Sequence, residues 1–417
     1  MKKRNSRSVR LMMTIITLLL VLTGCSNAGS SGSQQQPPTG NSGKQAEPAN
    51  KDQPAGAAPQ QAKGPIVLGG TYTLSGPAGI YGANMRDAAQ IAVDEVNAAG
   101  GINGQQIKFV VYDDETKPDK AVENTTKLLE SDKVFALVGF TATPVVAATA
   151  HLANEAKVPM SMMSGGYIIQ PAEKYIFGAV HPPEPVLRGV MLKLKEMGLK
   201  KIAILNSDDA LGQNSTKVIK SLIGEYGLSI VAEETYKNTD VDVTAQLTKI
   251  KGKQPDVLIS WATGSPMALV VNNAKQIGLE VPIVVSNGNA INQILDLLKG
   301  IPNNRILIPN GPTMVWKDLP DSQPSKKLIA DFNQKFNAKT KRNPDYTAAI
   351  GYDAMKMTID AIKSAGLDRN KVRDYLEAYS GSGLIGTYKR SANDHNGLAP
   401  EELLMMTIRD GNFAIFK

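Results

Sequence analysis

Apolar residues recur with two alternating periods from residue 65 onward. Short apolar runs bounded by Gly, Pro, Asn and Asp predict strands, and apolar residues three or four positions apart predict helices. Strands are expected at residues 66–73, 107–112, 134–138, 158–163, 175–180, 201–205, 229–233, 257–261, 283–285, 306–308, 403–408 and 413–416. Helices are expected at residues 85–96, 121–129, 144–155, 187–197, 216–226, 243–250, 267–277, 326–340, 347–365 and 371–379.

This alternation of strands and helices predicts parallel sheets that are covered by helices on both faces. The pattern starts afresh near His181, after the first five expected strands. We therefore expect an α/β chain with two lobes that are alike in architecture. No short-period repeat is present.

The segment from Val134 to Glu155 has the clearest local signal for a binding site. An apolar run ends at Gly139, and a helix begins again at Thr143 and Pro144. Thr is a good N-cap residue, and Pro is favoured at the first helical position. Free N–H groups would then lie beside the hydroxyls of Thr141 and Thr143, an arrangement that binds small anions such as carboxylates. The alternative is an ordinary strand–turn–helix unit with an unoccupied cap.

The first 25 residues have the pattern of a secretion signal. Five basic residues within the first ten precede an apolar run of twelve residues, Leu11 to Leu22. Twelve residues are too few to span a bilayer, which needs about 20, but they suit a signal peptide. Leu22-Thr23-Gly24-Cys25 resembles the bacterial lipobox, so we expect lipidation of Cys25, the only cysteine of the sequence. No disulfide can form within one chain.

Residues 26–64 contain no large apolar side chain and are rich in Gln, Pro, Gly, Ser and Ala. Such a segment cannot bury enough apolar surface to offset its ordering entropy, so we predict a disordered tether. A flexible chain of this length reaches roughly 35 Å.

The net charge of +7 does not indicate a nucleic-acid partner. Without the five basic residues at the N-terminus, the remainder of the chain carries a formal charge of only +2. No basic stripe with interleaved aromatic residues is present.

Several short motifs, in this order, resemble the type I periplasmic solute-binding proteins of ABC importers, in particular the leucine/isoleucine/valine-binding family. The motifs are Leu74-Ser-Gly-Pro77 with Tyr81-Gly82, Asn97-Ala-Ala-Gly-Gly-Ile-Asn-Gly104, Leu137-Val-Gly139, Lys157-Val-Pro-Met-Ser161, Asp242-Val-Thr-Ala-Gln-Leu247, Gly351-Tyr-Asp-Ala354 and Asp394-His-Asn-Gly397. Each motif is weak alone, but their combination and order are specific. The resemblance covers the chain from Ile66 to the C-terminus.

The resemblance implies two doubly wound, Rossmann-like lobes joined by three hinge crossovers, which we place near His181, Ile308 and Ile385. The expected domains are a signal peptide (1–24), a tether (25–64), an N-lobe (65–181 plus 309–384) and a C-lobe (182–308 plus 385–417). The family binds a solute between the lobes and catalyses no reaction. It also implies an ABC permease as partner, a monomer, no cofactor and no metal. The lipoprotein form implies an extracytoplasmic, membrane-anchored protein of a Gram-positive bacterium.

The resemblance also suggests how the solute is held. Family members that bind aliphatic amino acids hold the carboxylate at the position of Thr143 and at an Ala-Thr pair that matches Gly165-Gly166. An aromatic residue followed by glycine matches Leu211-Gly212. The acidic residue that receives the ammonium would fall near Asn287, where this chain has no carboxylate.

We therefore expect a small carboxylate-bearing solute, either a branched-chain amino acid or a related amide or aromatic acid. Trp261 either stacks on the solute or packs in the core. The expected ligand-binding residues are Ser75, Tyr81, Thr141, Thr143, Ser164, Gly165, Gly166, Trp261, Thr263 and Asn287.

Three other functions compete with this hypothesis. An enzyme is disfavoured because the sequence lacks HExxH, GxSxG and GxxxxGK[S/T] motifs. Its single GxGxxG, from Gly381 to Gly386, follows a helix instead of a strand. The pairs Asp113-Asp114 and Asp208-Asp209 are interpreted as loop residues at strand ends. A ligand-sensing lipoprotein without transport and a purely structural lipoprotein remain as alternatives.

Overall fold

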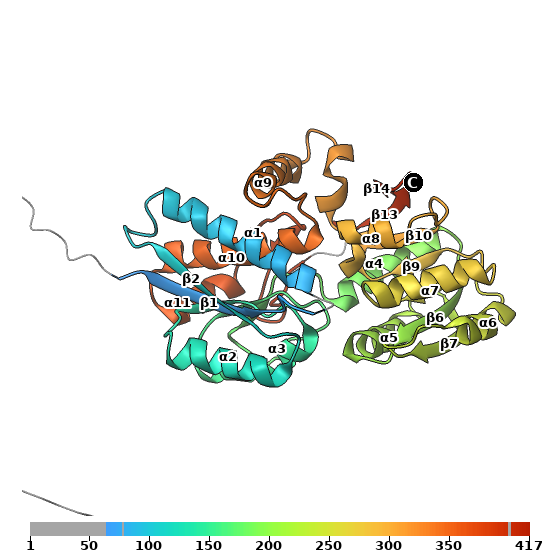
Figure 1. Cartoon of the computed structure of the whole chain (residues 1–417), viewed down its shortest axis with the longest axis horizontal. Coiled ribbons are helices and arrows are strands. Elements are labelled where there is room, and N and C mark those ends of the chain that lie inside the picture. Colours follow the sequence, from blue (N-terminus) through green and yellow to red (C-terminus); the bar gives the residue numbers. More distant parts are fainter. Residues whose placement is uncertain (1–63, 77–78, 399–401) are drawn as a thin grey trace, which may run out of the picture. The chain divides into compact units, whose positions relative to one another are not determined.

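Two mostly parallel β-sheets, each covered by helices, form the fold (Figure 1). The computed structural model describes residues 64–76, 79–398 and 402–417. The expected signal peptide, Cys25 and the tether up to residue 63 lie outside the described residues.

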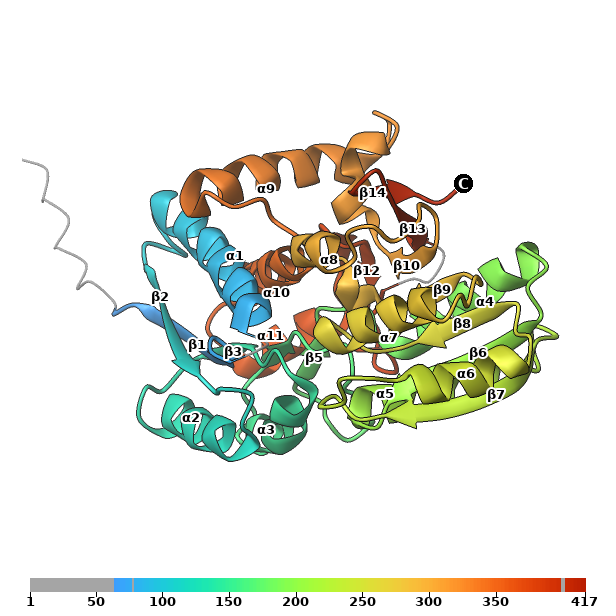
Figure 2. The same cartoon turned by 45° about the vertical axis from the view of Figure 1, so that its right-hand side comes forward.

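The first sheet has five parallel strands in the order β2-β1-β3-β4-β5. They are β1 (Ile66–Tyr72), β2 (Ile107–Asp113), β3 (Ala136–Gly139), β4 (Met160–Met162) and β5 (Ile176–Gly178). Successive side chains of β3 enter different apolar clusters. Ala136 and Val138 pack with helices α1 (Gly79–Ala98) and α10 (Tyr346–Ala365), whereas Leu137 packs with α2 (Pro118–Glu130) and α3 (Thr143–Glu155). The period of two thus places helices on both faces, as Figures 1 and 2 show.

The second sheet has seven strands in the order β14-β13-β10-β9-β8-β6-β7. They are β6 (Lys201–Ser207), β7 (Ser229–Tyr236), β8 (Val257–Ser260), β9 (Ile283–Val285), β10 (Ile306–Asn310), β13 (Leu404–Arg409) and β14 (Asn412–Ile415). All pairs from β7 to β10 are parallel, and the C-terminal strands β13 and β14 add an antiparallel edge. Helices α4 (Pro183–Glu196) and α5 (Ala210–Leu222) lie on one face, and α6 (Thr244–Gly252) and α7 (Ser265–Gln276) lie on the other.

The remaining elements connect these layers. They are η1 (Asn287–Asn289), α8 (Asn292–Leu297), η2 (Pro312–Asp318), α9 (Pro324–Thr340), α11 (Arg369–Glu377) and the hairpin of β11 (Ser380–Ser382) and β12 (Thr387–Lys389). The predicted α/β class with two doubly wound lobes is confirmed. The expected elements are present with shifted ends, but α8, the two 3-10 helices and the hairpin were not predicted. The GxGxxG segment belongs to this hairpin, because β11 and β12 pair across it.

Asp353 of α10 fixes the segment that precedes β12. Its carboxylate accepts hydrogen bonds from the N–H of Leu384 (2.8 Å) and of Ile385 (3.2 Å) and from the Tyr388 hydroxyl (3.3 Å). Asp353 is 4% exposed, and this burial raises its pKa to about 7 although the donors act in the opposite direction. The third crossover expected near Ile385 is therefore tied to the N-lobe by a buried acid.

The division into lobes follows the two sheets, and we propose the expected boundaries on that basis. The segment after β12 nevertheless contacts the first sheet. Arg390 donates to the carbonyl of Gly178 (2.8 Å), and His395 Nδ1 lies 2.8 Å from the carbonyl of Ile176. Arg390 and His395, which belong to the C-lobe under these boundaries, thus also contact β5.

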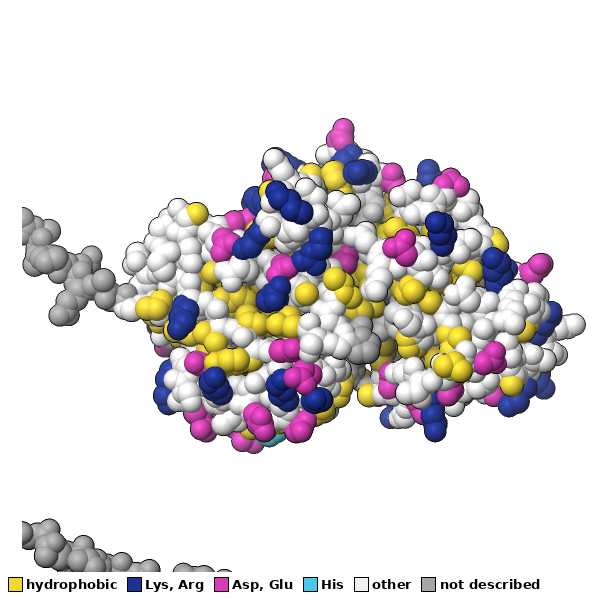
Figure 3. All heavy atoms as spheres, in the orientation of Figure 1, with side chains coloured by type: hydrophobic (Ala, Val, Ile, Leu, Met, Phe, Trp, Pro, Cys, Tyr) yellow, Lys and Arg dark blue, Asp and Glu magenta, His cyan; other side chains and the backbone are white. Residues whose placement is uncertain are grey.

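Basic and acidic side chains are interspersed over the face in Figure 3, and no patch of one sign dominates that view of the described residues. Within the same residues, no helix is both long and apolar enough to cross a membrane.

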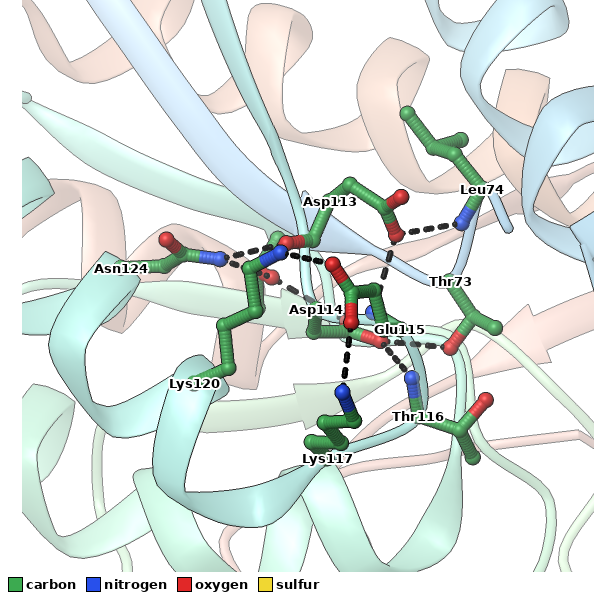
Figure 4. Close-up of polar contacts among 10 residues, drawn as sticks. Thr73, Leu74, Asp113, Asp114, Glu115, Thr116, Lys117, Lys120 and Asn124 are labelled. Atoms are coloured by element: carbon green, nitrogen blue, oxygen red, sulfur yellow. Dashed lines mark hydrogen bonds and ion pairs between the residues drawn. The ribbon is translucent and has the colours of Figure 1, made fainter. Parts of the chain in front are cut away.

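A buried acid also organises the loop after β1 (Figure 4). Asp114 accepts hydrogen bonds from the hydroxyls of Thr73 (2.7 Å) and Thr71 (3.1 Å) and from the N–H of Thr116 (2.9 Å). Its neighbour Asp113 accepts from the N–H of Leu74 (3.0 Å). The two adjacent carboxylates therefore join the end of β2 to the end of β1 by hydrogen bonds. This agrees with their interpretation as loop residues at strand ends.

Replacing Asp114 by Ala should lower the free energy of unfolding by roughly 2–4 kcal/mol, because three donors in a buried loop lose their acceptor. Urea denaturation would measure this loss. Glu123→Ala, which removes an exposed carboxylate from α2, is the control and should change stability by less than about 0.5 kcal/mol. Equal effects of the two substitutions would contradict the assigned role.

The raised pKa of Asp353 predicts a pH dependence of stability. An acid with a folded-state pKa of about 7 and an ordinary value of 3.8 binds more protons in the folded than in the unfolded state between these values. Stability therefore falls as pH rises through this window, by at most about 1.4 kcal/mol per pH unit. Urea denaturation from pH 4 to 7 would give the free energy of unfolding of wild type and of Asp353→Asn. The stability of wild type relative to Asp353→Asn should decline as the pH rises through this range. Asp296→Asn, an exposed control, should show no such decline. A constant difference for Asp353→Asn would refute the assignment.

Candidate functional site

A cavity of about 550 Å³ lies where strands of both sheets end. In parallel α/β sheets the carboxyl ends of the strands are the usual place for ligands. The lining residues are Thr73, Tyr81, Met85, Thr116, Thr141, Ala142, Thr143, Pro144, Met163, Ser164, Gly165, Gly166, Val180, Pro183, Asp209, Ala210, Leu211, Asn238, Trp261, Thr263, Ser286, Asn287, Gly288, Tyr346, Thr347 and Ile350.

The turn between β3 and α3 forms the N-lobe wall of the cavity. Phe140 is fully buried and has a φ of 62°, a conformation that a bulky residue rarely adopts. Its N–H donates to the carbonyl of Thr71 (2.8 Å), which holds the strained turn against β1. The turn directs the chain to Thr141, whose hydroxyl oxygen accepts a hydrogen bond from the N–H of Thr73 (3.1 Å).

Helix α3 begins at Thr143, so the expectation that Thr143 is the N-cap was wrong by one position. Ala142 is the N-cap and makes no side-chain cap, and Pro144 is the second helical residue. The reason is that the Thr143 hydroxyl bonds elsewhere, to the Ser164 hydroxyl at 2.9 Å. The N–H groups of the first turn thus have no capping side chain, which leaves the positive end of the helix dipole beside two hydroxyls.

Gly166 allows the loop after β4 to approach this hydroxyl pair. A Cβ atom at residue 166 would lie 2.3 Å from Thr143 Oγ1 and 3.4 Å from Leu211 Cδ1. A side chain at this position would therefore displace the Thr143 hydroxyl, whereas the sequence alone shows only that a hydroxyl is missing there. The Asn214 side chain from α5 also donates to the Gly166 carbonyl (3.4 Å), so the two lobes meet at this loop.

Trp261, Thr263 and Asn287 line the cavity from the C-lobe, after strands β8 and β9. Trp261 is 1% exposed and packs in the apolar cluster beneath α4 and α5. Trp261 therefore packs in the core and also lines the cavity. Asn287 donates from Nδ2 to the Tyr346 hydroxyl (3.2 Å), which leaves its Oδ1 as an acceptor.

The Tyr346 hydroxyl also lies 3.1 Å from His181 Nδ1. His181 is buried, and this burial lowers its pKa to about 3, so the imidazole is neutral near pH 7. The three side chains come from the first crossover, the start of α10 and the segment after β9. They form a neutral polar link between the lobes at the side of the cavity.

Tyr81 of α1 brings a hydroxyl to the cavity that has no hydrogen-bond partner within the described residues. Burial, together with the charge of Asp345, raises its pKa to about 12. An unsatisfied buried hydroxyl needs an explanation such as a bound ligand or water.

Nine of the ten expected ligand-binding residues line this one cavity. They are Tyr81, Thr141, Thr143, Ser164, Gly165, Gly166, Trp261, Thr263 and Asn287. Ser75 is exposed and is not among the lining residues. The reason is local, because the Leu74 N–H is tied to Asp113 and the chain leaves the cavity wall at this point.

Sequence reasoning missed several polar residues of the cavity, of which Asp209 is the most important. Asp209 was interpreted only as a loop residue. It is the N-cap of α5, which begins six residues before the expected start near Thr216, and its side chain accepts from the N–H of Gly212 (2.9 Å). The available signal was an Asp, a favoured N-cap residue, in the loop before the expected helix.

In the described part of the chain, no group of three or more His, Cys, Asp or Glu side chains could hold a metal ion. His151 is exposed on α3, and His181 and His395 are buried apart from the cavity lining.

The model of the family described as periplasmic binding protein matches residues 65–412. The chain is 24% identical over 335 residues to the leucine-, isoleucine-, valine-, threonine- and alanine-binding protein of Pseudomonas aeruginosa, covering 75% of this chain and 82% of that protein.

Two solved structures extend this similarity. An extracellular ligand-binding receptor from Rhodopseudomonas palustris HaA2 has a TM-score of 0.77 at 24% identity, over 84% of this chain and 99% of the other. The branched-chain amino acid transporter substrate-binding protein LivJ from Streptococcus pneumoniae, in complex with isoleucine, has a TM-score of 0.73 at 27% identity, over 84% of this chain and 97% of the other.

These relatives are solute-binding proteins, so the enzyme alternative is rejected in favour of binding without catalysis. The matched model covers both sheets, apart from the last residues of β14. The chain belongs to the periplasmic binding protein family, whose members bind small solutes and work with ABC transporter permeases.

Proposed function

We propose that this protein captures a small carboxylate-bearing solute in the cavity between its lobes and delivers it to an ABC permease. The observation that carries the proposal is the cavity itself, on which polar groups from both lobes converge beside unsatisfied donors. A cavity of about 550 Å³ lies within the usual range of small-molecule sites.

The carboxylate would bind at the N-lobe wall. The Thr143 and Ser164 hydroxyls bond to each other, so one hydroxyl hydrogen of the pair is left for a ligand. Thr141 accepts from Thr73 and can donate its own hydrogen. With the N–H groups of α3 and of residues 164–166, these donors surround a site that suits a small anion.

The rest of the solute would lie towards Tyr81 and the C-lobe residues Trp261, Thr263 and Asn287. Tyr81 would use its unpaired hydroxyl, and Trp261 would offer an apolar face. The complex of LivJ from Streptococcus pneumoniae with isoleucine supports a branched-chain amino acid. A Rhodopseudomonas palustris solute-binding protein of the same fold is in complex with benzoate, and we retain aromatic acids and amides as candidates.

We further propose that the protein is an extracytoplasmic lipoprotein anchored through Cys25, acting as a monomer at the cell membrane of a Gram-positive bacterium. The basic and apolar segments before Leu22-Thr23-Gly24-Cys25 support this. A lipidated cysteine followed by a polar segment would keep the lobes near a membrane permease.

Thermal unfolding of the protein should identify the solute. We expect the melting temperature to rise with at least one of L-leucine, L-isoleucine, L-valine, L-phenylalanine, benzoate and acetamide, because binding to the folded state alone stabilises it. Thr143→Val, which removes the hydroxyl but keeps the shape, should weaken the binding of that solute at least tenfold in calorimetry. Thr248→Val, on the exposed side of α6, is the control and should bind as wild type does.

Unchanged affinity in Thr143→Val would remove this residue from the site. The absence of any shift across the panel would favour a structural lipoprotein instead.

Lipid anchoring is tested separately. The full chain, expressed in a Gram-positive host, should partition into the detergent phase of Triton X-114 and incorporate labelled palmitate. Cys25→Ser should abolish both results, because a serine hydroxyl cannot form the thioether. Partitioning of Cys25→Ser into the detergent phase would contradict the lipoprotein proposal.

A further inference from the structure

Asp209 carries a charge that the proposed carboxylate site does not use. Among the described residues that line the cavity, it alone bears a formal charge at neutral pH. The other polar groups of the lining are hydroxyls, amides and backbone groups. The cavity is therefore neutral on the N-lobe side and negative at one point of the C-lobe side.

The position of Asp209 is fixed by the end of β6. Gly212 lies against this strand end so closely that a Cβ atom would be 2.0 Å from the Ser207 carbonyl oxygen. The Asp209 carboxylate accepts from the Ser207 hydroxyl and from the Gly212 N–H, both at 2.9 Å to Oδ1, and from Asn238 Nδ2 at 2.7 Å to Oδ2. All three donors are neutral, and Oδ2 has acceptor capacity left.

Asp209 lines the same cavity as the loop that we assign to the solute carboxylate. It precedes Leu211, whose Cδ1 lies 3.4 Å from a Cβ position on Gly166, and the α5 residue Asn214 bonds to the Gly166 carbonyl. One cavity lining thus contains free donors at the loop of residues 164–166 and a carboxylate at Asp209.

We infer that the solute carries a cationic nitrogen that binds the Asp209 carboxylate, so that the protein selects zwitterions over simple carboxylic acids. The inference rests on the proposed function and narrows its solute class. A simple acid would bring a second negative charge into the cavity, where it would be repelled by the Asp209 carboxylate. A zwitterion instead gives each charge a partner, with a charge-assisted hydrogen bond at Asp209.

The sequence places no carboxylate near Asn287, where the resemblance would put the partner of the ammonium. Asp209 reaches the same cavity from a different strand end, after β6 instead of β9. The absence at Asn287 therefore does not exclude a cationic ligand. The inference instead places the cationic end of the solute beside Asp209 and Asn238.

The competing explanation is that Asp209 only caps α5. Asp209→Asn separates the two roles, because Asn is an equally good N-cap and retains an acceptor for the Gly212 N–H. Asn238 is exposed and can turn its amide to meet the new side chain. Asp208→Asn is the matched control, since it removes the same charge from the adjacent residue, which is exposed and does not line the cavity.

The experiment compares ligand pairs that differ only by the ammonium group, L-leucine with 4-methylpentanoate and L-phenylalanine with 3-phenylpropanoate, by calorimetry. In wild type and in Asp208→Asn, at least one amino acid should bind 100-fold or more tightly than its deaminated analogue. In Asp209→Asn, this ratio should fall below ten, with the melting temperature of the unliganded protein changed little.

A deaminated acid that binds wild type as tightly as its amino acid would overturn the inference. The inference would also be overturned if Asp209→Asn kept the wild-type ratio of affinities for the amino acid and its deaminated analogue. If the deaminated acids bind and Thr143→Val weakens their binding, the proposed function stands and only the role of Asp209 fails. If wild type binds no member of either pair and no solute of the thermal panel, the proposed function fails together with the role of Asp209.

Discussion

The convergence of strand ends from two parallel sheets on one cavity is the constraint on which the site depends. Parallel strands end at one edge of each sheet, so the turns that follow them bring polar and backbone groups together from distant parts of the chain. Here the turns after β3, β4, β6, β8 and β9 supply most of the cavity wall. The strained turn at Phe140 and the buried Asp114 hold these ends in place, and apolar layers on both faces of each sheet hold the strands.

Two properties make this convergence suitable for capture of a solute instead of catalysis. The hydroxyls of Thr143 and Ser164 bond to each other, and the described residues that line the cavity include no histidine. The described lining of the cavity thus offers hydrogen-bond donors and acceptors for a solute. The Tyr346 hydroxyl lies 3.1 Å from His181 Nδ1 and accepts from Asn287, so it joins residues of both expected lobes.

The sequence predicted the strands and most helices because each buries a continuous apolar face, and burial is what the hydrophobic period reports. It predicted nine cavity residues because strand ends are recognisable and the family motifs mark them. It could not predict features that depend on contacts distant in sequence. The Thr143 hydroxyl bonds to Ser164 and not to its own helix, and it occupies the space that a side chain at Gly166 would need. Ser75 is drawn away because Asp113, from another strand, binds the preceding N–H. Asp209 was missed because the first turn of α5, Ala-Leu-Gly-Gln, lacks the apolar spacing that indicates a helix.

The most direct test of the central claim is a crystal structure of the protein grown with the solute that raises its melting temperature most. The account predicts electron density for that solute inside the cavity, with its carboxylate within hydrogen-bond distance of Thr143 or Ser164 and the rest of the molecule between Tyr81 and Trp261. Density for the solute at any other place, with the cavity occupied only by water, would contradict the account.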